Sequence, residues 1–511
     1  MGIFFREKFI WLCFVLGVMG FVFTSEQAFS QSGPGLHLPV DPYRIDYKEV
    51  YGNMHYDQPL RPQVHYTPIT GQIADPTGLI LYKGTYHLFY MYDEWSKKRG
   101  DNKNWGHAVS NDCIFWSQEP QITNTIIDNA PGSGSGIVDW NNTLKLQTGI
   151  EKTLVVFYTD YGRGPSLAFS KDAGKTWIRH KDNPILPGKS GLRDPNVFWF
   201  GPDQSWRMVI YEEEGFSFYK SDNLLRWKFL SRLDGFFECP DFIHMPADNL
   251  KERSRWVLLD GNGSYLVGDF DGEKFVPEGK RHFLGQDSSS NRTPHAFTKD
   301  IYATQTWKRS YEGDGPFYQL AFMRMGEAPV HERTWSQQMI FPVELTLQTI
   351  NNELQLCRNP IDGIKQLRFD PVVWKNREVH PGENLLKNLH ADVFELMLEM
   401  DVSDAGEIEL DIRGAKLTYN VIKQEICFLN THTAVAAENH RIKLRLIVDR
   451  NSVEVFVNKG ETTITRLFYP ENSNKNLGLT ARGGPVSLVN AAFYKLQSIW
   501  LKREQELGYN R

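Results

Sequence analysis

The chain has 511 residues, of which 41% are hydrophobic and 23% are charged, so it is long enough for two globular domains. Its formal net charge of −5 argues against nucleic acid or an anionic membrane as a partner. Aromatic residues make up 13% of the chain and include 14 Trp, which suits β-rich packing or stacking on sugars.

The first 30 residues (1–30) are predicted to be a signal peptide. Arg6 and Lys8 precede an apolar run over residues 9–23, and small residues before Gln31 fit a cleavage site. The run is short for a transmembrane helix. We therefore expect a secreted or periplasmic protein without membrane contact, an uncleaved N-terminal anchor being the alternative.

A strand–turn–strand pattern repeats along residues 31–345. Polar triplets follow apolar β-type runs and are themselves followed by Trp; they are Ser110-Asn111-Asp112, Ser170-Lys171-Asp172 and Ser221-Asp222-Asn223. A period of roughly 40–50 residues built from strands is typical of a β-propeller. The alternative is a β-sandwich in which the similar turns are coincidental. We expect residues 31–345 to form a propeller domain.

The repeat ends near residue 345, and residues 346–370 are predicted to be a linker. Beyond it, Glu407–Ile412 and Ser452–Val457 alternate between polar and apolar residues. Period-two alternation predicts an antiparallel β-sandwich over residues 371–498, followed by a C-terminal tail over 499–511. The expected fold class is all-β.

Three short motifs combine a carboxylate with a proline: Ala74-Asp75-Pro76, Arg193-Asp194-Pro195 and Glu238-Cys239-Pro240. They lie far apart, so only a fold that returns the chain repeatedly to one axis can bring them together. Two or three carboxylates and one guanidinium would then share a site, and carboxylate pairs hydrolyse glycosidic bonds. The plainer interpretation of each motif alone is a turn or a strand end.

Further blocks appear in the same order as in one known family. They are Arg61-Pro62 with His65-Tyr66-Thr67-Pro68, Trp105-Gly106-His107 with Trp116, Ser133-Gly134-Ser135, Phe341-Pro342-Val343-Glu344, and Leu446-Ile447-Val448-Asp449-Arg450. Together with the acidic motifs they resemble glycoside hydrolase family 32, the invertase, inulinase and levanase group. The resemblance covers nearly all of the chain after the signal peptide.

The resemblance implies a five-bladed β-propeller followed by a C-terminal β-sandwich. By motif, Asp75 would be the nucleophile, Glu238 the general acid/base and Asp194 the stabiliser of the transition state, with Arg193 beside it. The reaction would retain configuration through a covalent fructosyl-enzyme. Elementary chemistry adds that Asp75 should stay ionised among donors, such as backbone N–H groups of its own turn. Retention also requires the Asp75 and Glu238 carboxyls to lie about 5–5.5 Å apart.

Five residues are candidates for substrate binding: Trp105, Ser133, Arg193, Met91 and Asp241. Trp105 would stack on a sugar face or lie buried in the propeller. Ser133 would bind sugar hydroxyls or cap a tight turn. Asp241 would support Glu238 or pair with nearby backbone. No cofactor and no metal are expected, since the sequence offers no ligand set.

Several positions depart from the family pattern: Gln72, Ala74, Thr77, Met91 and Gly132. The family's first motif usually reads Trp-Met-Asn-Asp-Pro-Asn-Gly, so amide donors and aromatic surface are missing here. Each lost hydrogen bond is worth on the order of 0.5–1.5 kcal/mol. We expect weak binding of ordinary terminal fructose unless other side chains, such as Arg324, replace the contacts.

The expected function is a secreted retaining glycosidase that releases terminal fructose from fructans, fructo-oligosaccharides and sucrose, with sucrose a poor substrate. One alternative is a propeller glycosidase with shifted specificity, of the arabinanase kind, whose acids would lie farther apart if it inverts. Another is a non-catalytic carbohydrate-binding homologue. The expected partner is a carbohydrate, not nucleic acid, and the protein is expected to be a monomer or homodimer.

Overall fold

The computed structural model describes residues 56–96, 104–122, 131–187, 191–284, 301–307, 315–324 and 333–500. All of them belong to one compact unit, Pro42–Arg511. The predicted signal peptide and residues 501–511 of the predicted tail lie outside the described residues. Within the described ranges, no helix is long and apolar enough to cross a membrane.

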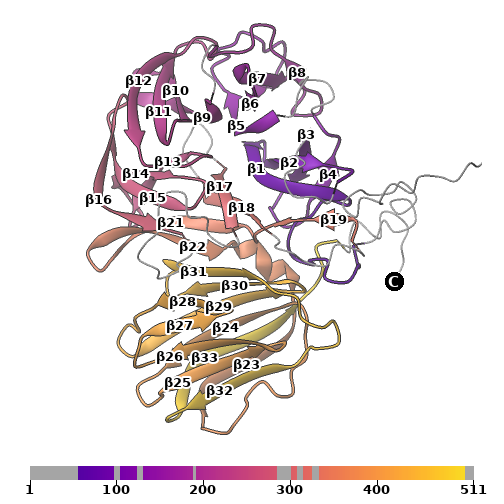
Figure 1. The fold of residues 1–511 in the computed structure, drawn as a ribbon, viewed down its shortest axis with the longest axis vertical. Coiled ribbons are helices and arrows are strands. Elements are labelled where there is room, and N and C mark those ends of the chain that lie inside the picture. Colours follow the sequence, from indigo (N-terminus) through magenta and orange to yellow (C-terminus); the bar gives the residue numbers. More distant parts are fainter. Residues whose placement is uncertain are drawn as a thin grey trace, which may run out of the picture. The chain divides into compact units, whose positions relative to one another are not determined.

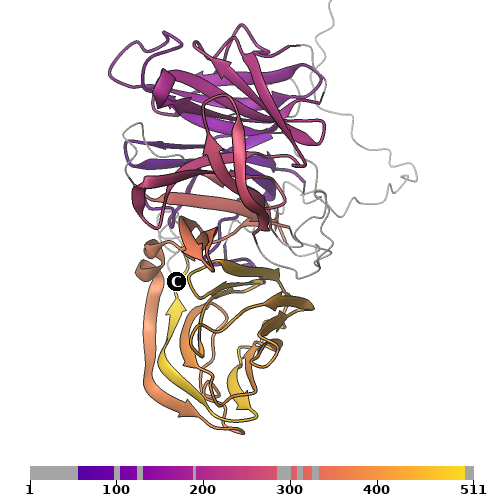
Figure 2. The same ribbon diagram turned by 90° about the vertical axis from the view of Figure 1, so that its left-hand side faces the viewer.

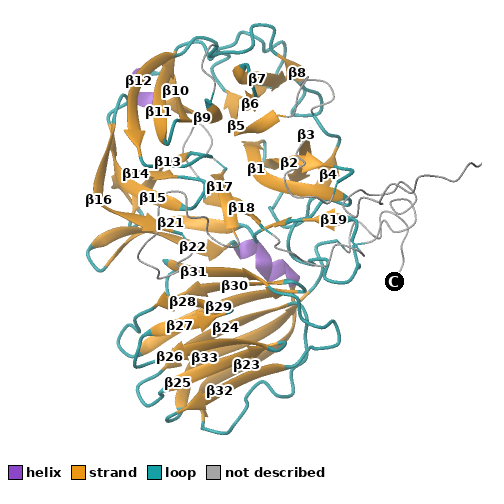
Figure 3. Cartoon of the chain, viewed as in Figure 1, coloured by secondary structure: helices purple, strands orange, loops and turns teal. Residues whose placement is uncertain are grey.

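Almost all regular structure is β-strand, so the predicted all-β class is confirmed (Figure 3). Three sheets hold the first strands, with the orders β19-β1-β2-β3-β4, β5-β6-β7-β8 and β12-β11-β10-β9 (Figure 1). Their bounds are β1 (Gly71–Tyr82), β2 (Thr85–Asp93), β3 (Asn104–Ser110), β4 (Ser117–Glu119), β5 (Pro131–Asp139), β6 (Thr153–Asp160), β7 (Gly164–Ser170), β8 (Ile178–Arg179), β9 (Arg193–Phe200), β10 (Ser205–Glu212), β11 (Gly215–Ser221), β12 (Lys228–Asp234) and β19 (Trp335–Ser336).

A fourth sheet has the order β16-β15-β14-β13-β21-β18-β17, with β20 on β18 and β22 on β21. Its strands are β13 (Asp241–Ala247), β14 (Leu250–Leu259), β15 (Ser264–Phe270), β16 (Phe275–Phe283), β17 (Ile301–Thr306), β18 (Phe317–Met323), β20 (Gln338–Met339), β21 (Val343–Ile350) and β22 (Glu353–Pro360). The strands β13 to β16 thus join the other strands of this sheet through the pairing of β13 with β21, and the count of five blades stays a prediction.

The polar triplets of the sequence repeat end the third strand of three successive sheets: β3, β7 and β11. In each turn the third residue of the triplet accepts backbone hydrogen bonds from residues two to four positions later, as Asp112 does from Ile114 and Phe115 at 2.9 and 3.0 Å. Such a side chain replaces a backbone partner and fixes the turn. The repeat therefore marks one turn of a recurring unit, which is why it indicated a propeller.

The C-terminal domain is a β-sandwich whose two sheets face each other in Figure 2. One sheet has the order β23-β33-β24-β29-β30-β31 and the other β28-β27-β26-β25-β32. Alternating burial along the strands, as in Glu407–Ile412, directs one apolar face of each sheet into a shared core. The strands are β23 (Arg368–Val379), β24 (Phe394–Asp401), β25 (Glu407–Ile412), β26 (Ala415–Asn420), β27 (Glu425–Phe428), β28 (Thr431–Ala434), β29 (Arg441–Asp449), β30 (Ser452–Val457), β31 (Thr462–Leu467), β32 (Leu477–Arg482) and β33 (Val486–Leu496).

The segment 346–370, predicted as a linker, is mostly regular structure. It contains the end of β21, all of β22 and the short 3₁₀ helix η3 (Asp362–Leu367). Another short 3₁₀ helix, η2 (Gly201–Asp203), lies between β9 and β10. Asn351 and Asn352 have φ of 49° and 64°, the geometry of a tight hairpin turn, so β22 folds back onto β21. Ile499 and Trp500, predicted as tail, are buried.

A buried ion pair joins the segment before β1 to the sandwich. His65 Nδ1 lies 2.7 Å from Asp449 Oδ2, and both side chains are fully buried. Burial opposes the charge on His65, but hydrogen bonds and attraction from Asp449 and Glu454 outweigh it and raise the pKa of His65 to about 9. The same Asp449 carboxylate accepts backbone N–H bonds from Gln63 and Val64 at 2.8 Å.

Candidate active site

The three acidic motifs meet at the beginnings of the innermost strands. Cys239 lies between two of the acids: its Sγ is 3.5 Å from Asp75 Oδ2 and 3.7 Å from Asp194 Oδ2. Arg193 lies between the other pair, with Nη2 2.8 Å from Glu238 Oε1 and Nε 3.9 Å from Asp194 Oδ2. Three carboxylates and one guanidinium therefore share one site.

A β-bulge lies at the site residue of three inner strands. The pairing shifts between Ile73 and Pro76 in β1, and between Gly132 and Gly134 in β5. In β9 the shift falls opposite the Val209–Tyr211 segment of β10, where Asp194 and its proline lie. A bulge adds one unpaired residue and redirects its side chain. In β1 and β9 the sequence favours the bulge because Pro76 and Pro195 lack the N–H needed for the ladder.

The two acidic positions outside β1 also have unusual backbone conformations. Asp194, Glu238 and Cys239 have φ of 62°, 50° and 45°. Such positive values are uncommon for residues other than glycine and cluster at functional sites. The backbone here is held by the contacts around it rather than by local preference.

Asp75 is half-buried at the edge of the cluster and accepts its hydrogen bonds from side chains. Ser133 Oγ donates to Asp75 Oδ2 at 2.7 Å, and the Cys239 thiol is the second donor. Burial raises the pKa of Asp75 above its usual value; the two donors and Arg324 oppose the rise, while Glu238 adds to it. The expected backbone donors of its own turn are replaced by side chains from β5 and the segment before β13.

Asp194 is 5% exposed and is tied to a neighbouring sheet. Its Oδ2 accepts the Cys239 backbone N–H at 3.0 Å, and its own N–H donates to Thr159 Oγ1 at 2.8 Å. Burial, followed by repulsion from Glu238, raises the pKa of Asp194 to about 7. Burial and the nearby Glu238 carboxylate therefore favour the protonated form of Asp194 more than water does.

Both carboxylate oxygens of Glu238 accept hydrogen bonds. Arg193 Nε donates to Oε1 at 3.0 Å, and the Tyr302 hydroxyl donates to Oε2. The two donors are themselves held by aromatic contacts. The Arg193 guanidinium lies 4.0 Å from the Tyr211 ring centroid, and that of Arg324 lies 3.7 Å from the Tyr302 ring centroid.

Tyr161, in the turn between β6 and β7, stands at the open side of the cluster and was missed from the sequence. A Cβ added at Gly132 would lie 2.8 Å from the Tyr161 hydroxyl oxygen, so the glycine makes room for this ring. Burial and the charges of the site acids raise the pKa of Tyr161, which keeps its hydroxyl protonated. The residue is 52% exposed, and its hydroxyl makes no hydrogen bond to any described residue.

Other site residues missed from the sequence were Thr159 and Tyr302, while Cys239 had been quoted only as part of its motif. Thr159 lies near the end of the apolar strand β6 and Tyr161 in the turn that follows it, a position that gives a weak signal for a site at that end of the sheet. Tyr302 lies in a strand that the repeat did not detect. The sequence carries no local sign of its contact with Glu238.

The five predicted substrate-binding residues divide into two groups. Ser133 and Arg193 lie in the cluster, where they bind Asp75 and Glu238. Trp105 is 0% exposed and donates its Nε1–H to the Gly132 carbonyl at 3.2 Å, so its ring has no free face for a sugar. Asp241 is also 0% exposed and accepts a hydrogen bond from Thr306 at 2.6 Å. Met91 is 8% exposed and packs in the propeller core opposite the β1 bulge.

The burial of Trp105 and Asp241 favours a structural role for both, and a contact of either with substrate stays a prediction. Trp105 is the second residue of β3, which pairs with β2, and its ring is buried in a hydrophobic cluster. Asp241 begins β13 and turns away from the pocket toward β17. Position in a motif identified the strand, but not the face on which the side chain lies.

Comparisons with known proteins agree along the chain. The model for the glycosyl hydrolases family 32 N-terminal domain matches residues 65–360, and that for the family 32 C-terminal domain matches residues 364–495. The chain is 31% identical to a levanase of Bacillus subtilis, over 87% of this chain and 72% of that protein. It is 27% identical to an extracellular exo-inulinase of Aspergillus awamori, over 87% of this chain and 96% of that protein. The crystal structure of exo-inulinase from Aspergillus awamori superposes with a TM-score of 0.74 at 25% identity, covering 87% of this chain and 100% of that one.

Proposed function

This chain belongs to glycoside hydrolase family 32, and we propose from that membership that it is a retaining glycosidase that hydrolyses β-fructosidic bonds. The observation that carries the proposal is the meeting of Asp75, Asp194 and Glu238 around Cys239 and Arg193. Carboxylates from three distant segments have no structural reason to share a buried site. Their mutual repulsion must be offset by donors, and the surrounding chain supplies them.

In the proposed reaction Glu238 gives a proton to the glycosidic oxygen while Asp75 attacks the anomeric carbon. The bond to the leaving group breaks and a covalent ester to Asp75 forms. Glu238 then takes a proton from water, which attacks the anomeric carbon; the bond from that carbon to Asp75 breaks, and the sugar leaves with its configuration retained. Glu238 can serve in both steps because its two oxygens are held in place by Arg193 and Tyr302.

Asp194 is proposed to stabilise the positive charge that develops on the sugar ring. It does not react, and a fixed carboxylate close to an oxocarbenium-like centre lowers the barrier electrostatically. Its pKa of about 7 means that the arrival of positive charge also favours its ionised form.

We propose that the substrate is a fructan or a decorated fructo-oligosaccharide, with sucrose a poor substrate. The segments around Asp75 depart from the family pattern at Gln72, Ala74, Thr77, Met91 and Gly132, while Tyr161 and Arg324 add a hydroxyl and a guanidinium to the site. Remote contacts with a longer substrate can offset weak binding of the terminal sugar. Secretion is proposed from the predicted signal peptide and is supported by the extracellular relative.

The test is a product screen on sucrose, inulin, levan and arabinan, with the released sugar and its initial anomeric configuration identified. Fructose released with retention supports the proposal. Arabinose, or inversion, would favour the arabinanase-like alternative. Asp75→Asn should abolish turnover with the fold intact, because an amide cannot attack. No release of any sugar by the unaltered protein would leave the non-catalytic binding protein as the function.

Glu238→Gln separates the acid role from a merely structural one. The variant should lose most activity on substrates with poor leaving groups and keep part of it on activated aryl fructosides, which need no proton. Equal rates with the unaltered protein on both substrate types would show that Glu238 is not the acid.

A further inference from the structure

A second cavity lies at the other end of the inner strands from the acids. It has a volume of about 510 Å³ and is lined by the continuations of the strands that carry the site: Leu79–Leu81 of β1, Gly136–Val138 of β5, Val197–Trp199 of β9 and Phe242–His244 of β13. Each continuation begins three to four residues after Asp75, Ser133, Asp194 or Glu238. At about 3.3 Å per residue, the cavity is separated from the acids by roughly 10–13 Å.

We propose that this cavity is a second binding site for a neutral carbohydrate chain, distinct from the hydrolytic site. The proposal of a second site rests on the proposed function only in its choice of sugar, since a different set of residues lines this cavity. Its volume falls in the range of small-molecule sites, roughly 300–1,000 Å³.

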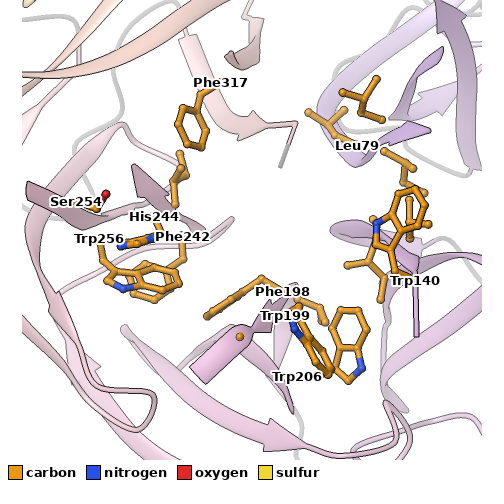
Figure 4. Close-up of a pocket in the computed structure, with 18 of the residues that line it drawn as sticks. Leu79, Trp140, Phe198, Trp199, Trp206, Phe242, His244, Ser254, Trp256 and Phe317 are labelled. Atoms are coloured by element: carbon orange, nitrogen blue, oxygen red, sulfur yellow. The ribbon is translucent and has the colours of Figure 1, made fainter. Parts of the chain in front are cut away.

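Tryptophans surround the opening of the cavity. Figure 4 shows Trp140 and Trp256 on opposite sides of the cavity, with Trp199 and Trp206 between them. Trp140, Trp199 and Trp256 are half-buried, so part of each indole remains accessible. Indole rings offer an apolar face for the C–H groups of a sugar and an N–H for a hydroxyl.

These tryptophan rings are held in place by packing before any ligand binds. The Trp256 ring stacks on Phe242 with centroids 4.5 Å apart and packs at a tilt against His244 at 4.8 Å. Trp199 meets Trp206 edge-on at 5.1 Å. A preformed aromatic surface loses little conformational entropy on binding, which favours affinity.

The lining of the cavity carries little charge. Of the described residues that line the cavity, Lys251 is the one side chain with an unconditional charge, and Asn141 and Ser254 are neutral hydrogen-bonding groups. Burial lowers the pKa of His244, so its imidazole is neutral at pH 7 and can both donate and accept. Neutral polar groups around aromatic faces fit the hydroxyls and C–H faces of an uncharged sugar better than they fit an anion.

A second attachment point would matter most for a polymer. When one part of a long chain is held, the local concentration of the rest around the enzyme rises, without any new contact at the acids. The expected signature is a lower KM on polymeric substrate and no effect on short oligosaccharides.

The test uses a glycine pair. Gly201 lines the cavity, and a Cβ added there meets no atom within 4 Å, so Gly201→Trp should fill the opening without disturbing the fold. Gly149 has the same freedom away from the cavity, which makes Gly149→Trp the matched control. Each is combined with Asp75→Asn and titrated calorimetrically with oligosaccharides of levan and inulin.

We expect two binding events for Asp75→Asn alone and for Asp75→Asn combined with Gly149→Trp. When Asp75→Asn is combined with Gly201→Trp, the affinity of one of the two events should fall at least tenfold. Trp199→Leu, with Trp227→Leu as control, should reproduce the loss. With Asp75 intact, Gly201→Trp should keep kcat/KM on short fructo-oligosaccharides and raise KM on polymer several-fold. A single binding event in every variant would overturn the proposal. So would a result in which Gly201→Trp abolishes binding of an apolar dye and leaves sugar binding unchanged.

The same titration distinguishes failure of the second site from failure of the proposed function. If the unaltered protein cleaves no fructan, it is titrated with a panel of other neutral glycans. A glycan whose binding is lost only in Gly201→Trp would support the second site while removing the fructosidase. Fructan cleavage with a single binding event would support the proposed function and exclude the second site.

Discussion

At the scale of single residues, the state of each acid depends on donors from other parts of the chain. Asp75 is held by Ser133 of β5 and by the thiol of Cys239. These donors oppose the rise in the pKa of Asp75 that burial causes, and a nucleophile must be ionised to attack. Ser133 is therefore expected to act through Asp75 rather than on the sugar alone.

Ser133→Ala should make the enzyme more sensitive to acid. Without the donated hydrogen bond the pKa of Asp75 rises further, so the acidic limb of the kcat/KM profile moves to higher pH. A hydrogen bond to a charged group is worth about 1.5–3 kcal/mol, which predicts a loss of about tenfold or more on the acid side. The pH profile of kcat/KM on a fructo-oligosaccharide measures it.

Ser135→Ala is the matched control, because Ser135 lies on the same strand but accepts its hydrogen bond from the Val197 N–H. It should change stability and leave the position of the acidic limb unchanged. An unshifted limb in Ser133→Ala would contradict the role assigned to Ser133.

Tyr161→Phe should raise KM about two- to tenfold with little change in kcat. The hydroxyl has no hydrogen-bond partner among the described residues and stands beside the acids, so we expect it to bind a substrate hydroxyl. Gly132→Ala should have a similar effect, since the new methyl group would displace the ring. Steady-state kinetics measure both, with Tyr318→Phe as the control; an unchanged KM in Tyr161→Phe would exclude the contact.

The sequence identified the three acids but not the orientation of several neighbours. Asp75, Asp194 and Glu238 were recognisable because each lies near a proline within a family motif. Trp105 and Asp241 are buried in the folded sheets, and a motif does not reveal which face of a strand is covered. Tyr161 and Tyr302 come from segments with no motif, and only the folded sheets bring them to the acids.

At the scale of elements, the bulges of β1, β5 and β9 explain how a regular sheet carries a site at its edge. Each bulge turns one residue out of the ladder at the strand's beginning, while the rest of the strand continues into the core. The sequence predicted the strands from their apolar runs. The predicted linker over 346–370 contains the end of β21, β22 and η3. We propose instead that the domains meet near η3.

The last described residues behave as part of the first segment. Trp500 is fully buried, stacks on Tyr56 at 3.9 Å and donates to the Pro62 carbonyl at 3.0 Å. Ile499 donates its backbone N–H to the Gln63 carbonyl at 2.9 Å. A chain ending after Ser498 should therefore lose about 3–5 kcal/mol of unfolding free energy, as for removal of a buried tryptophan.

A chain ending after Trp500 is the control and should unfold at the same denaturant concentration as the full protein. Chemical denaturation followed by fluorescence measures both truncations. Equal midpoints for the two would show that the docking of Trp500 is unimportant.

At the scale of the whole molecule, the His65–Asp449 pair should make stability depend on pH. The folded-state pKa of His65 is about 9 and its ordinary value is 6.5. Its stabilisation is therefore fully present below about pH 6.5 and is lost as the pH rises through 9. His65→Gln should cost about 3–5 kcal/mol at pH 6, because a buried Asp449 is left without its partner.

The difference in unfolding free energy between His65→Gln and the unaltered protein should shrink between pH 6.5 and 9. His380→Gln, at a largely exposed position in the sandwich domain, should show no such trend. A constant difference across this range would mean that His65 is neutral in the folded protein.

The contacts of the segment before β1 also set an order of events during synthesis. Its partners are Asp449 and Trp500, and the bond from Trp500 to Pro62 spans 438 positions. At about 5–20 residues per second, that separation corresponds to roughly 20–90 s of translation. The early segment must wait exposed for that time, and contacts of such high contact order form slowly. The nascent chain thus depends on residues synthesised late to complete the packing of a segment synthesised early. A ribosome that stalls after the propeller would release a protein in which the segment before β1 stays exposed and prone to aggregate.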